Sequence, residues 1–301
     1  AGSLVGFLFP FIFTWIGISN IAPQGVVPDS VIYSFYIGAA ILILCVIYTT
    51  VKVKEMPPAE YAEYHGITEE EEKEKINMVK LLIKAPKAFW TVGLVQFFCW
   101  FAFMFMWTYT NGSVAANVFD APTVETAVNG VSKVMLDTKS IQYQDAADWV
   151  GVLFAVQAIG SVLWAVCIPL FKDRKLIYSL SLVLGGLGFI STYFVHNQYV
   201  LFISFLLIGC AWAAMLALPF TILTNALSGG HMGTYLGLFN GTICIPQIVA
   251  ASLGGSILAL FTPKGMLPPE INMLVMAGVM LIIGAVCVYL IKETKGEQTK
   301  A

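Results

Sequence analysis

The charged residues of this chain lie almost entirely between long apolar stretches, and this pattern limits the possible folds more than any other feature. Each stretch is about 20 residues long, the length that an α-helix needs to cross a bilayer core of about 30 Å. Eight such stretches follow one another, at residues 3–22, 30–51, 88–112, 148–171, 176–195, 199–224, 232–261 and 270–291. The sequence therefore predicts an all-α polytopic membrane protein with eight transmembrane helices.

The composition excludes several other classes of protein. Charged residues make up 11% of the chain, whereas soluble domains carry about 25%. The formal net charge of −2 leaves no basic surface for phosphate groups, so we expect no nucleic-acid partner. The six cysteines are far apart and form no Cys/His cluster, so we expect no metal ion, disulfide framework or cofactor.

The basic residues predict the orientation of the helices. All but three of the 16 Lys and Arg residues lie in segment 52–87, in residues 172–175 and in the C-terminal tail. If the spans alternate in direction, these three segments share one side of the membrane. Because basic loops collect on the cytoplasmic side, we expect segment 52–87 and the C-terminus in the cytoplasm, and the protein in the cell membrane (plasma or inner).

Two of the predicted loops are long. Segment 52–87 contains the acidic run 69–72 and ends in residues 76–84, where apolar side chains recur at helical spacing between lysines. This pattern favours a short amphipathic helix on the membrane surface, with a plain linker as the alternative. The other long loop, 113–147, is predicted to be a lid or a packed loop on the opposite side.

The order of spans and loops suggests half of a larger transporter. Two spans, a charged loop and six further spans fit a twelve-helix transporter made of two six-helix bundles. We therefore expect a fragment or a processed product. Its predicted parts are the last two helices of the N-terminal bundle at 1–51, a cytoplasmic linker at 52–87, the C-terminal six-helix bundle at 88–294 and a cytoplasmic tail at 295–301.

Three segments carry motifs that resemble one transporter family. Residues 95–102 read VQFFCWFA and are followed by MWTYT at 106–110, and residues 237–249 contain GLFN and IPQIV. Residues 171–175, FKDRK, are similar to a short cytoplasmic Asp-Arg-x-Gly-Arg-Lys motif, without its Gly-Arg part. Together these segments resemble the sucrose/proton symporter branch of the major facilitator superfamily, the glycoside–pentoside–cation symporter type.

This resemblance implies a major facilitator-type helical bundle that lacks its first four helices. It also implies proton-coupled uptake of a di- or oligosaccharide or another glycoside by alternating access. By the same analogy, Asp173 and Arg174 would form a cytoplasmic gating latch between helix ends.

Polar and aromatic side chains share one face of the predicted helix 88–112. At about 100° per residue, their spacing keeps them within a strip about 80° wide. The strip holds Gln96, Trp100, Phe103, Trp107 and Asn111. Amides bond to the hydroxyls of a sugar and an indole ring stacks on its apolar face, so the strip suits a sugar. The alternative is that the amides bond to neighbouring helices.

Other predicted helices add amides and a tryptophan near their centres. Gln157 and Trp212 lie near the middle of the fourth and sixth stretches, and Asn240 and Gln247 are seven residues apart, on one face of the seventh. We predict no catalytic residue. The predicted substrate-binding residues are Gln96, Trp100, Trp107, Asn111, Gln157, Trp212, Asn240 and Gln247.

Titratable groups are missing from the centres of the predicted spans. Intramembrane ionisable residues usually mark proton relays, so we expect the coupling acid in the four absent helices. Pro219 and Pro246 lie inside spans and predict kinks. Gly233, Gly237 and Gly241 are four residues apart and predict a smooth face for close helix contact.

These observations favour a secondary active transporter whose partners are a sugar, protons and the lipid bilayer. The alternatives are a carrier of another small polar solute, a non-transporting scaffold or sensor, and a truncated product. A membrane-embedded enzyme would need catalytic carboxylates or metal ligands at the membrane boundary. The chain has no repeated Asp-rich motif, so we expect no enzyme activity.

Overall fold

The fold is a bundle of long apolar helices. The computed structural model describes residues 2–19, 27–54, 57, 60, 78–128, 131–227 and 232–291. Within these ranges, seven helices are long and apolar enough to cross a membrane. This result confirms the predicted all-α membrane class, with seven such helices described where eight spans were expected.

The difference lies in the first predicted span, 3–22. The corresponding helix α1, Gly2–Trp15, has only 14 residues in the described part of the chain. It is followed by Gly17, which has a φ of 94°. This left-handed backbone conformation is one that glycine adopts readily and that ends a right-handed helix.

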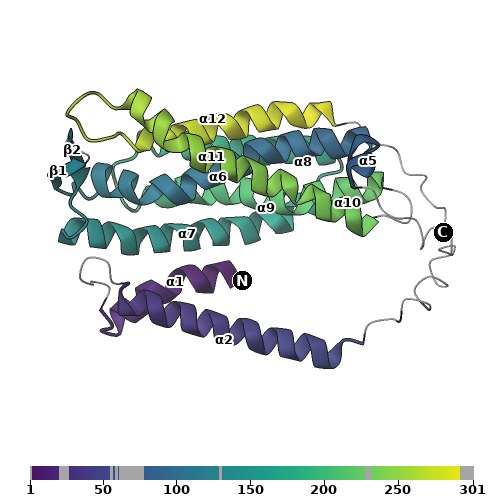
Figure 1. The fold of residues 1–301 in the computed structure, drawn as a ribbon, viewed down its shortest axis with the longest axis horizontal. Helices are drawn as coiled ribbons and strands as arrows, with labels where there is room; N and C mark the ends of the chain where they lie inside the picture. Colours follow the sequence, from purple (N-terminus) through teal and green to yellow (C-terminus); the bar gives the residue numbers. More distant parts are fainter. Residues whose placement is uncertain are drawn as a thin grey trace.

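Six spans form one bundle, shown in Figure 1. The central helix α6, Lys87–Asn117, packs against α7, α9, α11 and α12. The other helices of the bundle are α7 (Ile141–Cys167), α8 (Arg174–Ser191), α9 (Leu201–Ala226), α10 (Met232–Phe239), α11 (Gly241–Phe261) and α12 (Ile271–Cys287). Short 3-10 turns extend α7 at Ile168–Leu170 (η1) and α12 at Val288–Leu290 (η2). The predicted span 232–261 corresponds to one candidate span, Gly233–Phe261, in which a turn at Asn240 separates α10 from α11.

Glycines let the helices of this bundle approach closely. A Cβ atom at Gly186 of α8 would lie 2.8 Å from the backbone oxygen of Gly278 in α12. A Cβ at Gly188 would lie 2.7 Å from the backbone oxygen of Ser204 in α9, and one at Gly160 of α7 would lie 2.6 Å from that of Leu206. Helix α8 therefore contacts both α9 and α12 backbone to backbone.

The glycine contact face predicted at Gly233, Gly237 and Gly241 is wrong. No described atom lies within 4 Å of a Cβ built on Gly233 or Gly237, and at Gly241 the nearest is 3.9 Å away, in the side chain of Ile245 on the same helix. Four-residue spacing shows that glycines share a face, but whether another helix covers that face depends on the packing of the whole bundle.

Helices α1 and α2 lie beside the bundle rather than within it. Helix α1 packs against α7 and against α2, Asp29–Lys52. The rings of Phe7 and Phe154 join α1 to α7, with centroids 5.3 Å apart. Figure 1 shows this pair alongside α7, where α2 exposes most of its surface. The division of the chain into two bundles stays a prediction.

The loop predicted as 113–147 contains a feature that the sequence analysis missed. Strands β1, Thr123–Val128, and β2, Val131–Leu136, pair antiparallel, with Thr123 opposite Leu136. The Asn-Gly pair at 129–130, between two runs with alternating apolar residues, is a strong hairpin signal that could have found it. We call this end of the molecule the hairpin end.

The opposite end carries the short helix α5, Met78–Ile83, and we call it the α5 end. Met78, Val79 and Ile83 of this helix are exposed. An amphipathic helix was predicted here, but its contact with a membrane stays a prediction. The acidic run 69–72 and the tail 295–301 lie outside the described residues.

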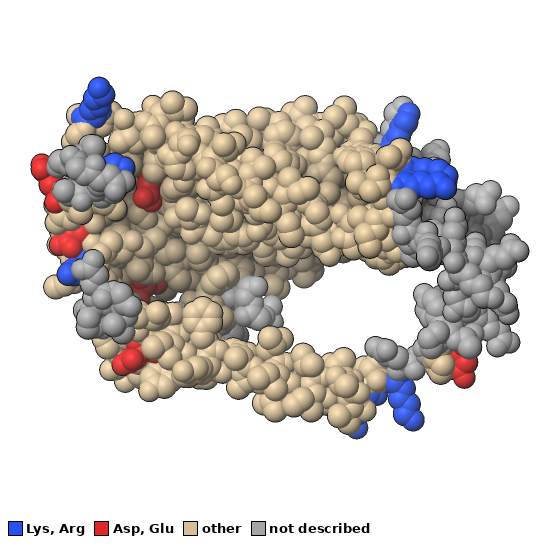
Figure 2. Space-filling model, in the orientation of Figure 1, with Lys and Arg blue, Asp and Glu red and all other residues tan. Residues whose placement is uncertain are grey.

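Charges of opposite sign favour opposite ends of the molecule. Figure 2 shows Asp and Glu mainly at the hairpin end and a group of Lys and Arg at the α5 end. The described basic residues of the α5 end are Lys52, Lys54, Lys80, Lys84, Lys87, Lys172, Arg174 and Lys175. The orientation in the membrane was predicted from this same distribution of Lys and Arg, so the orientation stays a prediction.

Candidate functional site

Four aromatic side chains meet in the middle of the bundle, and we call them the tryptophan cluster: Trp100, Phe103 and Trp107 of α6, and Trp212 of α9. The ring centroid of Trp212 lies 5.9 Å from Trp100, 4.9 Å from Phe103 and 5.9 Å from Trp107. Trp100 and Trp107, two helical turns apart, are 6.4 Å from each other. The spacing on α6 predicted that face, and packing against α9 adds Trp212.

The tryptophan cluster is open on one side. Trp107 is 39% exposed and Trp212 is half-buried, whereas Trp100 and Phe103 are buried. An apolar ring surface accessible in the middle of a membrane bundle offers a flat platform for a ligand.

Three buried polar atoms on the same strip of α6 have no hydrogen-bond partner among the described residues. They are Oε1 of Gln96, Nε1 of Trp100 and Oδ1 of Asn111. Buried polar atoms in proteins are nearly always paired, so this strip offers two acceptors and one donor to a ligand or to water. The strip is therefore polar as well as aromatic.

One half of the Gln96 amide has a structural function. Its Nε2 donates to the backbone oxygen of Met215 in α9, at 3.1 Å. That oxygen has no intrahelical partner from Pro219, because proline lacks an N–H. The bond thus satisfies the carbonyl that the proline frees and fixes α6 to α9 one turn from the tryptophan cluster. The sequence analysis left open that such amides bond to neighbouring helices, and the side-chain nitrogen of Gln96 does so.

Gln157 lies where α7 crosses α9, and its side chain is 3% exposed. A Cβ at Gly209 of α9 would overlap the backbone oxygen of Gln157. The close approach of the two helices at this glycine thus places Gln157 in the interior. No ring or hydrogen-bond contact joins it to the tryptophan cluster in the described part of the chain.

Asn240 and Gln247 lie on the seventh predicted span but in different settings. Asn240 is an exposed turn residue at the junction of α10 and α11. Its backbone oxygen still accepts from the N–H of Cys244 at 3.1 Å, and one candidate span, Gly233–Phe261, runs through it.

Gln247 is half-buried on α11. Elsewhere α11 contacts α6 through Thr242 beside Gly93 and through Gly254 beside Tyr109.

The residues of the predicted latch, Asp173 and Arg174, lie at the start of α8. Both are exposed. Asp173 is the N-cap, and its Oδ1 accepts from the backbone N–H groups of Lys175 at 2.9 Å and Leu176 at 3.1 Å. The carboxylate thus stabilises its own helix, and a gating function for the pair stays a prediction.

The sequence analysis missed Glu270, which precedes the span Ile271–Leu290 as the N-cap of α12. Its carboxyl group packs on Gly112 of α6. Burial raises the pKa of this carboxyl from 4.5 to about 7. Glu270 begins the last predicted apolar stretch, which made it look like a boundary residue. Its burial could not be read from the sequence, because it depends on the notch that Gly112 leaves in another helix.

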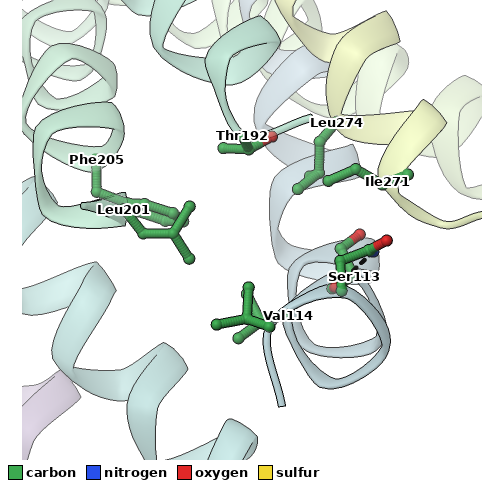
Figure 3. A pocket seen from close by; sticks show the side chains of 9 residues that line it. Ser113, Val114, Thr192, Leu201, Phe205, Ile271 and Leu274 are labelled. Carbon is green, nitrogen blue, oxygen red and sulfur yellow. Dashed lines mark hydrogen bonds between the residues drawn. The ribbon is translucent and has the colours of Figure 1, made fainter. Parts of the chain in front are cut away.

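A small pocket opens at the hairpin end, lined by Ser113 and Ile271, the chain neighbours of Gly112 and Glu270. Figure 3 shows Leu201 and Phe205 of α9 on one side of it, and Ile271 and Leu274 of α12 with Ser113 of α6 on the other. The remaining lining residues are Val114, Asn117, Val118 and Thr192. None of the predicted substrate-binding residues lines this pocket.

Comparison with known proteins identifies a family for this bundle. Residues 114–301, more than half of the chain, match the sequence model of the Major Facilitator Superfamily. No curated protein matches the chain.

Proposed function

This chain belongs to the Major Facilitator Superfamily of secondary transporters, and on that premise we propose that it carries a sugar, a di- or oligosaccharide or another glycoside, together with protons, by alternating access. As a member of that family it is a multi-pass membrane protein and not an enzyme, and its substrate is a small molecule.

The observation that carries the sugar proposal is the pairing of unpartnered polar atoms with an accessible indole. Nε1 of Trp100 offers a donor, and Oε1 of Gln96 and Oδ1 of Asn111 offer acceptors. Trp107, between Trp100 and Asn111 on the same strip, exposes its ring. A sugar has hydroxyls that both donate and accept, and apolar ring faces that stack on indole.

The motifs at 95–110 and 237–249 support the sucrose/proton symporter branch. We propose that Gln157, Trp212, Asn240 and Gln247 complete the substrate site, and that residues 1–51 and 88–294 belong to two different bundles. Segment 52–87 and the α5 end would face the cytoplasm of a cell whose plasma or inner membrane holds the protein.

Sugar binding can be measured directly on the purified protein in lipid nanodiscs. We expect sucrose or maltose to change the tryptophan fluorescence saturably, and Trp107→Phe to weaken the apparent affinity at least tenfold, because a smaller ring leaves the indole contact incomplete. Trp90→Phe is the matched control, since Trp90 is exposed on the same helix outside the cluster. If the two substitutions changed the apparent affinity equally, the tryptophan cluster would not be part of the substrate site.

Uptake separates the proposed substrate class and coupling ion from the alternatives. Cells that express the complete reading frame should accumulate labelled sugar, and a protonophore should abolish the accumulation. Uptake of another small polar solute, with no response to either sugar, would leave the family assignment intact and overturn the glycoside proposal. Accumulation that persists with protonophore would overturn proton coupling.

A further inference from the structure

Three helices meet around the carboxyl group of Glu270 at the hairpin end. A Cβ atom at Gly112 would overlap this carboxyl group, and its Oε1 would lie 2.8 Å away. Tyr109, one turn before Gly112 on α6, and Tyr143 of α7 are close enough to interact electrostatically with it. The hydroxyl of Tyr109 in turn packs on Gly254 of α11, where a Cβ would lie 2.5 Å away. The site is therefore built by tertiary packing rather than by the loop before α12.

No positive group compensates the carboxylate. In the described ranges, no hydrogen bond or ion pair involves its oxygens. The titratable groups that face it are Tyr109 from α6 and Tyr143 from α7, whereas α8, α11 and α12 bring none to this end. Burial is the single cause of the raised pKa of the carboxyl.

The other titratable groups of the hairpin end include the exposed Lys264, and Asp145 and Asp148 further along α7. They also include the exposed His196, whose Nδ1 lies 3.3 Å from the backbone oxygen of Asn117 at the pocket.

A neutral carboxyl fits the surroundings better than a carboxylate. Asn111 lies beside Gly112, and its side chain is within hydrogen-bond reach of the Tyr143 hydroxyl. The other end of its amide, Oδ1, is buried without a donor. A protonated Glu270 brings one O–H donor to this cluster, whereas the charged form adds two acceptors and a charge that needs water.

We propose that Glu270 is a proton-binding site that joins α12 to α6 when its carboxyl is neutral and lets the hairpin end hydrate when it is charged. The small pocket lined by Ser113 and Ile271, the chain neighbours of Gly112 and Glu270, is where water would enter. The site lies outside the tryptophan cluster but shares Asn111 with the proposed substrate site. It is on this chain, whereas the coupling acid is expected in the four absent helices.

Infrared titration of the whole chain in lipid nanodiscs tests proton binding without any transport. The band of a protonated carboxyl should persist to near-neutral pH and disappear with a midpoint of about 7. Glu270→Gln should remove the Glu270 share of this band, and Asp148→Asn measures the share of Asp148, a half-buried carboxyl of α7 at the same end. Glu125→Gln, in the exposed strand β1 of the same end, should leave it in place. A carboxyl band that is absent at neutral pH, or one that Glu125→Gln removes, would overturn the proposal.

A labelling experiment tests the structural consequence. Ser113 is 1% exposed. In a background without the native cysteines, Ser113→Cys should react slowly with a soluble thiol reagent at low pH. Above the midpoint its rate should rise at least tenfold more than thiolate formation alone explains. The same cysteine in the Glu270→Gln background is the matched control, because its thiol has the same chemistry. It should show only the rise due to thiolate formation. Equal profiles in the two backgrounds would contradict the proposal, as would a midpoint set by added Na⁺ rather than by pH.

Discussion

Gln96 shows how one side chain can serve both folding and binding. Its nitrogen satisfies the Met215 carbonyl, and its oxygen stays unpartnered among the described residues, on the strip that holds Trp100. The sequence placed Gln96 on the correct face of its helix, because the spacing of residues along α6 fixes that face. The acceptor of its amide was beyond prediction, because it belongs to a helix more than 100 positions away.

We expect Gln96→Leu to lower the free energy of unfolding by about 1–3 kcal/mol, because it leaves the buried carbonyl of Met215 unpaired. In a Pro219→Ala background, Gln96→Leu should lower the free energy of unfolding much less, because the alanine N–H at position 219 can donate to that carbonyl within α9. Thermal unfolding of the four proteins in detergent measures this. The same loss in both backgrounds would show that the Gln96–Met215 bond does not respond to the proline.

Glu270 should make the stability of the protein depend on pH. The pKa of its carboxyl is about 7 in the folded protein and 4.5 in its ordinary state. Between these values the folded state binds more protons than the unfolded state, so the stabilising effect is complete below about pH 4.5 and is lost as pH rises through about 7. We expect the melting temperature to fall across this window and Glu270→Gln to flatten the profile. An unchanged slope in that variant would assign the effect to other groups.

At the scale of the element, hydropathy predicted where the helices lie but not where they break. Predicted and observed bounds of the second span differ by one residue at each end, 30–51 against Asp29–Lys52. Apolar runs fix such limits because charged residues flank them. Hydropathy does not predict the turn at Asn240, because the helices on both sides of it, α10 and α11, are apolar. The hairpin was missed because the loop was judged on polarity rather than on its Asn-Gly turn.

Glycine contacts give the sharpest prediction for a single helix. Gly186→Ala should destabilise the bundle by about 1–3 kcal/mol, because the new Cβ lies 2.8 Å from the backbone oxygen of Gly278 and α8 must move away from α12. Gly255→Ala is the matched control, with no described atom within 4 Å of its Cβ. It should be neutral or stabilising by up to about 1 kcal/mol through helix propensity. The melting temperatures of the two variants test this prediction. A larger loss of stability in Gly255→Ala than in Gly186→Ala would contradict the close contact of α8 with α12.

At the scale of the whole molecule, the distribution of charge predicts the orientation in the membrane. The described Lys and Arg residues of the α5 end outnumber Lys133, Lys139 and Lys264 of the hairpin end. The candidate site was predictable only in part. Trp100 and Trp107 followed from spacing on one helix, whereas their contact with Trp212 and the burial of Glu270 arise from the packing of separate helices.

Orientation can be tested with single cysteines in a background that lacks the native ones. We expect Lys133→Cys to react with a membrane-impermeant thiol reagent added to intact cells, because the predicted topology has β2 outside the cell. Lys80→Cys on α5 should react only after the cells are permeabilised. The reverse pattern would invert the predicted topology without affecting the fold.

The glycine contacts of α8 have a mechanical consequence. Side chains that interdigitate can change rotamer and let two helices slide, whereas backbones in direct contact at Gly186, Gly188 and Gly278 leave no such slack. We therefore expect the part of the bundle formed by α8, α9 and α12 to be stiff and to move as one rigid body. We expect larger movements at the edge of the bundle. There α1 packs mainly against α7 among the described helices of the six-span bundle, and α10 meets α11 at the exposed Asn240.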